Sequence, residues 1–226
     1  MARDIYVYGF RSPIARIAAF VASIALTAVG AEICIYVGPV PYTMQNMGIV
    51  FAGLMLSPSD AALAQLCYLA LIAFGLPIAA GAHGGPYVLL GYTAGYLWAF
   101  PLASALYSIA SRSYLAKVGR SLADARLRDY AVLWLLTLPC VAPVYILGYA
   151  VFYAYAVVLG ARGLCVWSTR AIHALLRVSA SSMPLPLALF LASVAIFVPQ
   201  DMFMDHVLGV ALGIAAAKLM RSRGLA

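Results

Sequence analysis

Charged side chains are scarce in this sequence: Asp, Glu, Lys and Arg make up only 9% of its 226 residues. A soluble domain carries about 25% charged residues, so the scarcity excludes an ordinary soluble protein. Hydrophobic residues account for 65% of the chain and the mean hydropathy is +0.99, which indicates an integral protein of the lipid bilayer. The net charge of +7 is typical of a membrane protein with Arg-rich cytoplasmic segments, and nucleic acid is not expected as a partner.

Cysteine is also sparse, and the four residues Cys34, Cys67, Cys140 and Cys165 fit no metal-binding spacing. Because three of them lie in apolar runs, we interpret all four as small core residues. The sequence has no Gly-x-Ser-x-Gly, no His-Glu-x-x-His and no P-loop motif. We therefore expect no enzyme, no metal site and no cofactor.

Apolar runs predict six transmembrane helices in a single domain covering residues 1–226. The first five lie at 13–37, 47–56, 61–74, 92–110 and 130–159. The apolar run 185–198 is too short for a full span, and Pro199-Gln200-Asp201 is expected to break it. The sixth span is then a final helix that starts near Asp201.

The segment 112–129 is the one long polar connection, with a net charge of +3, and the positive-inside rule places it in the cytoplasm. Both termini are then cytoplasmic in a multi-pass protein of the cell membrane, and the breaks at 38–45, 75–91 and 160–200 face outward. The arginines within 160–183 oppose this orientation. Arg170, His173 and Arg177 fall near one helical face there, which predicts an interfacial amphipathic helix.

Polar groups beside glycines and aromatics gather in these outer breaks. Because ligand sites are mostly apolar pockets with a few placed polar groups, they predict an outward-facing site for a small, partly apolar solute. The expected contacts are Thr43, Gln45, His83, Gly84, Gly85, Tyr87, Thr93, Tyr96 and Asp201. Gln45 is well suited to such a site because its amide both donates and accepts hydrogen bonds.

Several of these residues have two interpretations. Asp201 is either the N-cap of the last helix or a ligand contact, and one aspartate can serve both roles. His83 either contacts the ligand or orders its own turn. Asp205 and His206 lie close to Asp201, so an ion-coupled secondary transporter remains an alternative.

The first predicted span carries alanines at four-residue spacing, a pattern that lets a second helix approach closely. Its members are Ala15, Ala18, Ala19 and Ala22. The pattern alone is equally consistent with internal packing and with docking of a partner.

Four motifs lie within about sixty residues of one another: Val40-Pro41-Tyr42-Thr43-Met44-Gln45, Gly75-Leu76-Pro77 with Gly81, Gly84-Gly85 and Leu90-Gly91-Tyr92-Thr93-Ala94-Gly95-Tyr96. This stretch closely resembles the core of the BioY family. A weaker match continues through 145–160 and Val198-Pro199-Gln200-Asp201. The departures are Tyr92, Ala94, Gln200 and Met204, which stands where the family usually places a Lys three residues after the Asp.

The resemblance implies the biotin-specific S component of an energy-coupling factor (ECF) vitamin transporter. Its expected fold is a six-helix bundle whose outer loops dip over the substrate pocket. Biotin would be captured outside, and a transmembrane coupling subunit with two ATPase subunits would use the ATP. The alanine face of the first span would then be the docking helix, and His206 or an Arg from 160–183 would replace the missing Lys. An S component for another vitamin is the main alternative.

Overall fold

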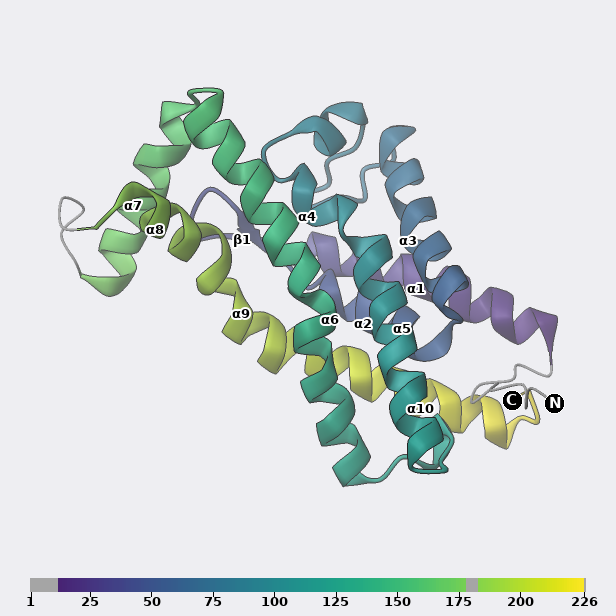
Figure 1. The fold of residues 1–226 in the computed structure, drawn as a ribbon. Helices are drawn as coiled ribbons and strands as arrows, with labels where there is room; N and C mark the ends of the chain where they lie inside the picture. Colours follow the sequence, from purple (N-terminus) through teal and green to yellow (C-terminus); the bar gives the residue numbers. More distant parts are fainter. Residues whose placement is uncertain (1–11, 178–182, 226) are drawn as a thin grey trace.

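The computed structural model describes residues 12–177 and 183–225, and most of these residues are helical (Figure 1). The α-helices are α1 (Pro13–Glu32), α2 (Asn46–Met55), α3 (Pro58–Ala73), α4 (Ala94–Trp98), α5 (Phe100–Lys117), α6 (Leu127–Tyr153), α7 (Arg162–Leu176), α8 (Leu185–Phe190), α9 (Phe197–Gln200) and α10 (Val207–Ser222). Short 3-10 helices are η1 (Pro86–Leu90) and η2 (Leu122–Asp124), and π-helical segments are η3 (Ala154–Val158), η5 (Leu191–Ala195) and η6 (Asp201–His206). Strands β1 (Ile35–Tyr36) and β2 (Pro41–Tyr42) form a small antiparallel hairpin.

Three helical stretches are long and apolar enough to cross a membrane, namely Pro13–Glu32, Leu127–Val158 and Leu185–Ser222. Helices α2 and α3 are apolar but shorter. The prediction of an all-α membrane protein is confirmed, whereas the count of six spans stays a prediction.

Helix α2 lies at the centre of the bundle, and every one of its residues is buried. It packs against α1, α5 and α10. Glycines make these contacts close: a Cβ on Gly48 would lie 2.2 Å from the Thr27 hydroxyl oxygen, and one on Gly209 would lie 2.8 Å from Cβ of Val50. The central position of α2 brings its amino end, and the polar residues there, against the C-terminal helix.

The predicted break at Pro199-Gln200-Asp201 is wrong. Residues 185–222 form one apolar helix that contains the two π-helical segments η5 and η6. Pro199 lacks the N–H that an α-helix would bond to the carbonyl of Ala195. The helix nevertheless continues through α9, which is flanked by the wider π-helical turns η5 and η6. Asp201 has helical dihedrals (φ −59°, ψ −47°) and is therefore not an N-cap.

Other expected boundaries also shift. The first span ends at Glu32, and the residues that follow form the β1–β2 hairpin. The predicted span 92–110 is divided at Ala99 into α4 and α5.

The predicted amphipathic helix is α7. Its residues Ser168, Ala171 and Ile172 are buried, whereas Arg170 and His173 are exposed. The part of this prediction at residues 178–182 lies outside the described residues.

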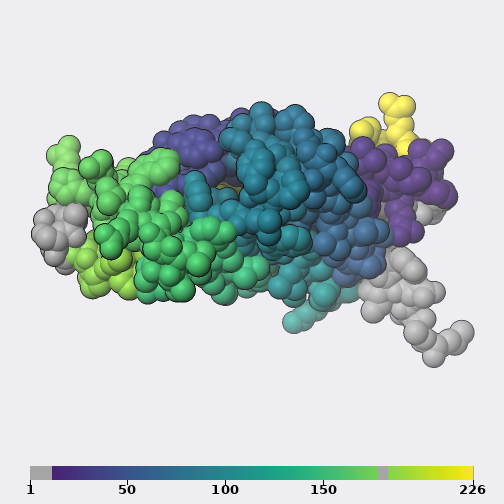
Figure 2. Space-filling model, turned by 90° about the horizontal axis from the view of Figure 1, so that it is seen from above, coloured from purple at the N-terminus to yellow at the C-terminus, as the bar shows by residue number. Residues whose placement is uncertain are grey.

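The elements are arranged along an elongated body. Helices α7 and α8 lie at one end, and the start of α1 and the end of α10 lie at the other (Figure 1). Seen from above, the blue segment around residues 75–98 lies beside the purple-blue hairpin region near the middle of the molecule (Figure 2). Two of the predicted outer breaks therefore meet on one face.

Candidate binding site

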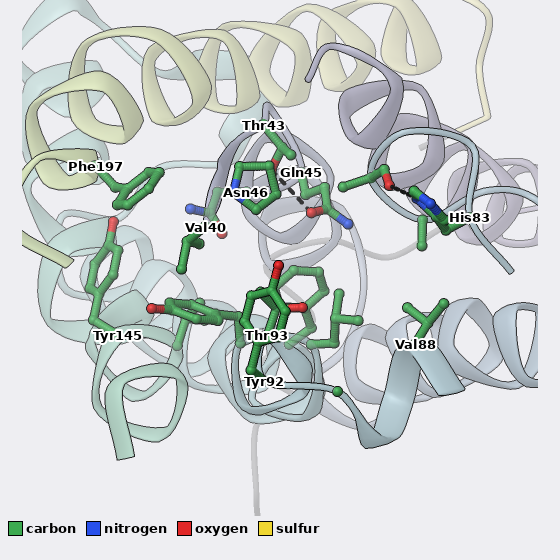
Figure 3. A pocket seen from close by; sticks show the side chains of 18 of the residues that line it. Val40, Thr43, Gln45, Asn46, His83, Val88, Tyr92, Thr93, Tyr145 and Phe197 are labelled. Carbon is green, nitrogen blue, oxygen red and sulfur yellow. Dashed lines mark hydrogen bonds between the residues drawn. The ribbon is translucent and has the colours of Figure 1, made fainter. Parts of the chain in front are cut away.

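A cavity of about 250 Å³ lies between the hairpin, the amino end of α2, the loop 79–93, α4, α6 and the C-terminal helix (Figure 3). Its walls are largely aromatic, and the rings come from Tyr36, Tyr87, Tyr92, Tyr96, Phe100, Tyr145 and Phe197. Burial raises the pKa of Tyr36 above its ordinary value, so this phenol stays protonated at neutral pH. Such walls suit a flat, partly apolar molecule.

Seven of the nine predicted contacts line this cavity: Thr43, Gln45, His83, Tyr87, Thr93, Tyr96 and Asp201. Gly84 and Gly85 are not among the lining residues. The structure thus brings together side chains from segments that are about 160 residues apart in the sequence. Ligand binding by these residues stays a prediction.

Thr43 and Gln45 are fixed by the end of α1. The N–H of Met44 donates to the carbonyl of Gly30 at 2.8 Å, and a Cβ on Gly30 would lie only 2.2 Å from the Met44 oxygen. Only glycine allows this close approach. The hydroxyl of Thr43 then donates to Gln45 Oε1 at 3.0 Å.

The side-chain amide of Gln45 is hydrogen-bonded through both its oxygen and its nitrogen. Its Nε2 donates to the Tyr68 hydroxyl at 2.8 Å, and that hydroxyl donates to the carbonyl of Ile78, also at 2.8 Å. An amide nitrogen has two hydrogens, so one N–H of Gln45 is left for a ligand. The same chain of bonds connects the amino end of α2 to the outer loop.

Gly84 and Gly85 shape the outer loop from behind. A Cβ on Gly84 would lie 2.3 Å from the carbonyl oxygen of Leu76, and Gly85 has φ +110°, a conformation that favours glycine. Gly85 also donates its N–H to the Ile72 carbonyl at 2.7 Å. Both residues therefore position the loop rather than face the cavity.

His83 fits both of its interpretations. Its Nδ1 lies 2.8 Å from the carbonyl oxygen of Ala80, which orders the turn, and its side chain also lines the cavity. Backbone hydrogen bonds between Ala79 and His83 close the same turn.

Asp201 is buried, with 5% of its surface exposed, and it reaches the cavity from the middle of the long C-terminal helix. Its Oδ2 accepts hydrogen bonds from Asn46 Nδ2 at 2.9 Å and from the Tyr145 hydroxyl at 2.7 Å. Both partners line the cavity, and sequence reasoning missed both. The signal for Asn46 was available, since it follows Gln45 at the start of an otherwise apolar run.

Asp205 and His206 have side-chain hydrogen-bond partners other than those of Asp201. Gln200 Nε2 donates to Asp205 Oδ1 at 2.6 Å, whereas His206 Nδ1 lies 2.7 Å from the Thr137 hydroxyl oxygen. Neither residue lines the cavity, and Met204 is half exposed. Among the described residues, His83 is the only basic side chain in the cavity wall, so neither His206 nor a described Arg of the 160–183 segment replaces the expected Lys there.

The alanine face of α1 is divided in this structure. Ala15 and Ala19 are buried, with 3% and 1% of their surfaces exposed, so they pack inside the bundle and are not available to a partner. Ala18 is exposed and Ala22 is partly buried. The four-residue spacing therefore combines an internal contact and an outer surface.

Comparison with known proteins agrees with this architecture. The crystal structure of an S-component for biotin from an ECF-type ABC transporter matches with a TM-score of 0.62 at 22% identity, over 93% of this chain and 94% of that one. This likeness shows the fold, and the S-component-like fold class is confirmed.

Curated relatives match over the part of the sequence that carries the motifs. The probable biotin transporter BioY of Bacillus subtilis is 43% identical over 95 residues, or 42% of this chain and 51% of that protein. Its counterpart in Pyrococcus horikoshii is 47% identical over 81 residues, 36% and 50% of the two chains. The chain thus spans about half the length of the curated relatives it matches. The model of the BioY family, in contrast, matches residues 7–221, and the chain therefore belongs to the BioY family.

Proposed function

We propose that this protein is the biotin-binding S component of an ATP-driven ECF transporter, and that it is not itself an enzyme. The observation that carries the proposal is the cavity. Seven contacts expected from the sequence surround one space, in a chain of the BioY family. The names of its relatives, which are biotin transporters, support biotin as the ligand.

The chemistry of the cavity suits biotin. The ligand has a fused ring with a polar ureido group and an apolar chain that ends in a carboxylate. The Asp201 carboxylate accepts N–H donors, and the free N–H of Gln45 donates to a carbonyl oxygen. The aromatic walls cover the apolar part of the ligand.

The proposed partners are a transmembrane coupling subunit and two ATPase subunits. The sequence has no P-loop motif, so ATP would be hydrolysed by those subunits. Both termini would be cytoplasmic, and the cavity would take biotin from outside and deliver it inward. The whole chain would act as one substrate-binding domain.

Calorimetric titration of the detergent-purified protein tests the proposal. We expect saturable binding of biotin with one site per chain, and no binding of thiamine or riboflavin under the same conditions. Binding of another vitamin in place of biotin would support the alternative S component. Failure to bind biotin in a protein that melts cooperatively would contradict the proposed function.

A further inference from the structure

Asp201 is a buried acidic residue whose hydrogen-bond partners are neutral. Within the described part of the chain, the ion pairs are Arg16–Asp60, Arg120–Asp129 and Arg221–Asp124, and none of them involves Asp201. The side chains that hydrogen-bond to Asp201 are the neutral Asn46 and Tyr145. A buried charge is costly unless hydrogen bonds satisfy it, and these two donors lower that cost for the Asp201 carboxylate.

The two donors act on the same oxygen. Asn46 Nδ2 reaches Oδ2 from α2 at 2.9 Å, and the Tyr145 hydroxyl reaches Oδ2 from α6 at 2.7 Å. The donors come from two different helices and together hold Oδ2 in place; Figure 3 labels the Asn46 and Tyr145 side chains in the cavity wall. In the part of the chain that the structure describes, no side chain bonds to Oδ1, and Asp201 lines the cavity.

Asn46 occupies a place that packing alone would give to an apolar residue. It is 7% exposed, and the rest of α2 consists of apolar residues and glycine. It is also the single asparagine among 226 residues. A buried amide is unfavourable unless it is hydrogen-bonded, and its side-chain amide nitrogen bonds to Asp201.

We propose that Asn46 and Tyr145 are positioning residues that engage one oxygen of Asp201 and turn the other toward the ligand. The oriented Oδ1 then selects a ligand group that donates an N–H, and it disfavours an anionic group at this end of the cavity. The identity of that group as the ureido of biotin rests on the proposed function. The hydrogen bonds of Asn46 and Tyr145 to Asp201, which we call the neutral clamp, do not depend on it.

The first experiment uses matched tyrosines on one helix. Tyr145→Phe removes the hydroxyl that bonds to Asp201, and Tyr149→Phe removes a hydroxyl that donates to the Pro186 carbonyl at 3.0 Å and lies outside the cavity lining. We expect Tyr145→Phe to weaken biotin binding by about tenfold, the usual loss for one hydrogen bond to a charged group, and Tyr149→Phe to change it by less than about twofold. Equal affinities of the two variants would overturn the proposal.

The second experiment exchanges the amide and the carboxylate. Asn46→Asp and Asp201→Asn are each expected to lower the melting temperature. Asn46→Asp leaves two carboxylates facing each other, and Asp201→Asn removes the negative charge to which Asn46 and Tyr145 donate hydrogen bonds. The double variant restores an amide–carboxylate pair and is expected to recover most of the lost melting temperature. It is not expected to recover biotin binding, because the carboxylate is then carried by α2 and no longer occupies its original position in the cavity wall.

These outcomes separate the two claims. If Asn46 and Asp201 only held the helices together, the double variant would recover both its stability and its biotin binding. That result would contradict a positioning role for Asn46. If the unaltered protein fails to bind biotin, the proposed function is wrong, yet the melting temperatures of the single and double variants still decide whether Asn46 and Asp201 form the clamp. Single variants as stable as the unaltered protein would refute the clamp itself.

Discussion

At the scale of the residue, the cavity depends on a glycine behind its wall as well as on the side chains that line it. Tyr96 lines the cavity, and its hydroxyl donates to the Ser193 carbonyl at 2.5 Å. Its ring lies directly over Gly148, where a Cβ would be 2.3 Å from two ring carbons. Gly148 therefore sets the position of a cavity wall that it does not itself form.

We predict that Gly148→Ala destabilises the protein by about 1–3 kcal/mol, because the added methyl group forces the Tyr96 ring to move. The displaced ring should also weaken biotin binding. Gly163→Ala in α7 is the matched control, since a Cβ there meets nothing within 4 Å. Thermal melts and calorimetry check both variants, and unchanged stability of Gly148→Ala would show that the ring moves without cost.

Sequence reasoning found seven of the residues that line the cavity but not the hydrogen-bond partners of Asp201. Thr43 and Gln45 belong to a continuous motif, so one short stretch identifies them. Tyr145 is one of 15 tyrosines, and nothing in its neighbourhood distinguishes it. Its role depends on a contact with a residue 56 positions away, which only the packed helices reveal.

At the scale of the element, local signals predicted helices well and their continuity poorly. Pro199 reads as a helix breaker, yet π-helical segments on both sides of α9 keep residues 185–222 in one helix. Hydrogen-bond patterns of this kind leave no clear mark in hydrophobic periodicity. The amphipathic pattern of α7, in contrast, repeats over several turns and was predicted correctly.

In helix α1, the neighbouring residues Ala18 and Ala19 allow a prediction in which each variant serves as the control for the other. Ala18 is exposed and Ala19 is 1% exposed, so the same enlargement acts outside the bundle in one case and inside it in the other. We expect Ala19→Leu to cost about 1–3 kcal/mol of stability through overpacking. Ala18→Leu should leave stability and biotin binding unchanged but reduce co-purification with the coupling subunit. Normal co-purification of Ala18→Leu would argue against docking through this face.

At the scale of the whole molecule, the described ion pairs involve residues near the start of α1 and the end of α10 and in the α5–α6 connection. This is the end at which α1 begins and α10 ends (Figure 1). Basic residues gathered at one end support our proposal that this end is cytoplasmic. The exposed arginines of α7, at the other end, are the feature that opposes it.

The predicted orientation can be tested with single cysteines introduced into a variant whose own four cysteines are replaced by alanine. Gly163→Cys should react with a membrane-impermeant maleimide in intact cells. Lys117→Cys, exposed at the end of α5, should react only after the membrane is permeabilised. The reverse pattern would invert the topology and place the arginines of α7 in the cytoplasm.

The widened turn at η6 (Asp201–His206) changes how this chain is to be aligned with its relatives. Three residues on from Asp201, the family pattern reaches Met204, which is half exposed, whereas four residues on lies the fully buried Asp205. In a π-helical turn a face recurs later than in an α-helix, so wherever a relative is α-helical here, matching columns beyond Asp201 lie on different sides of the helix. Roles transferred by alignment column across this segment are then assigned to the wrong side chain, and superposed backbones are the sounder basis for comparing orthologues here.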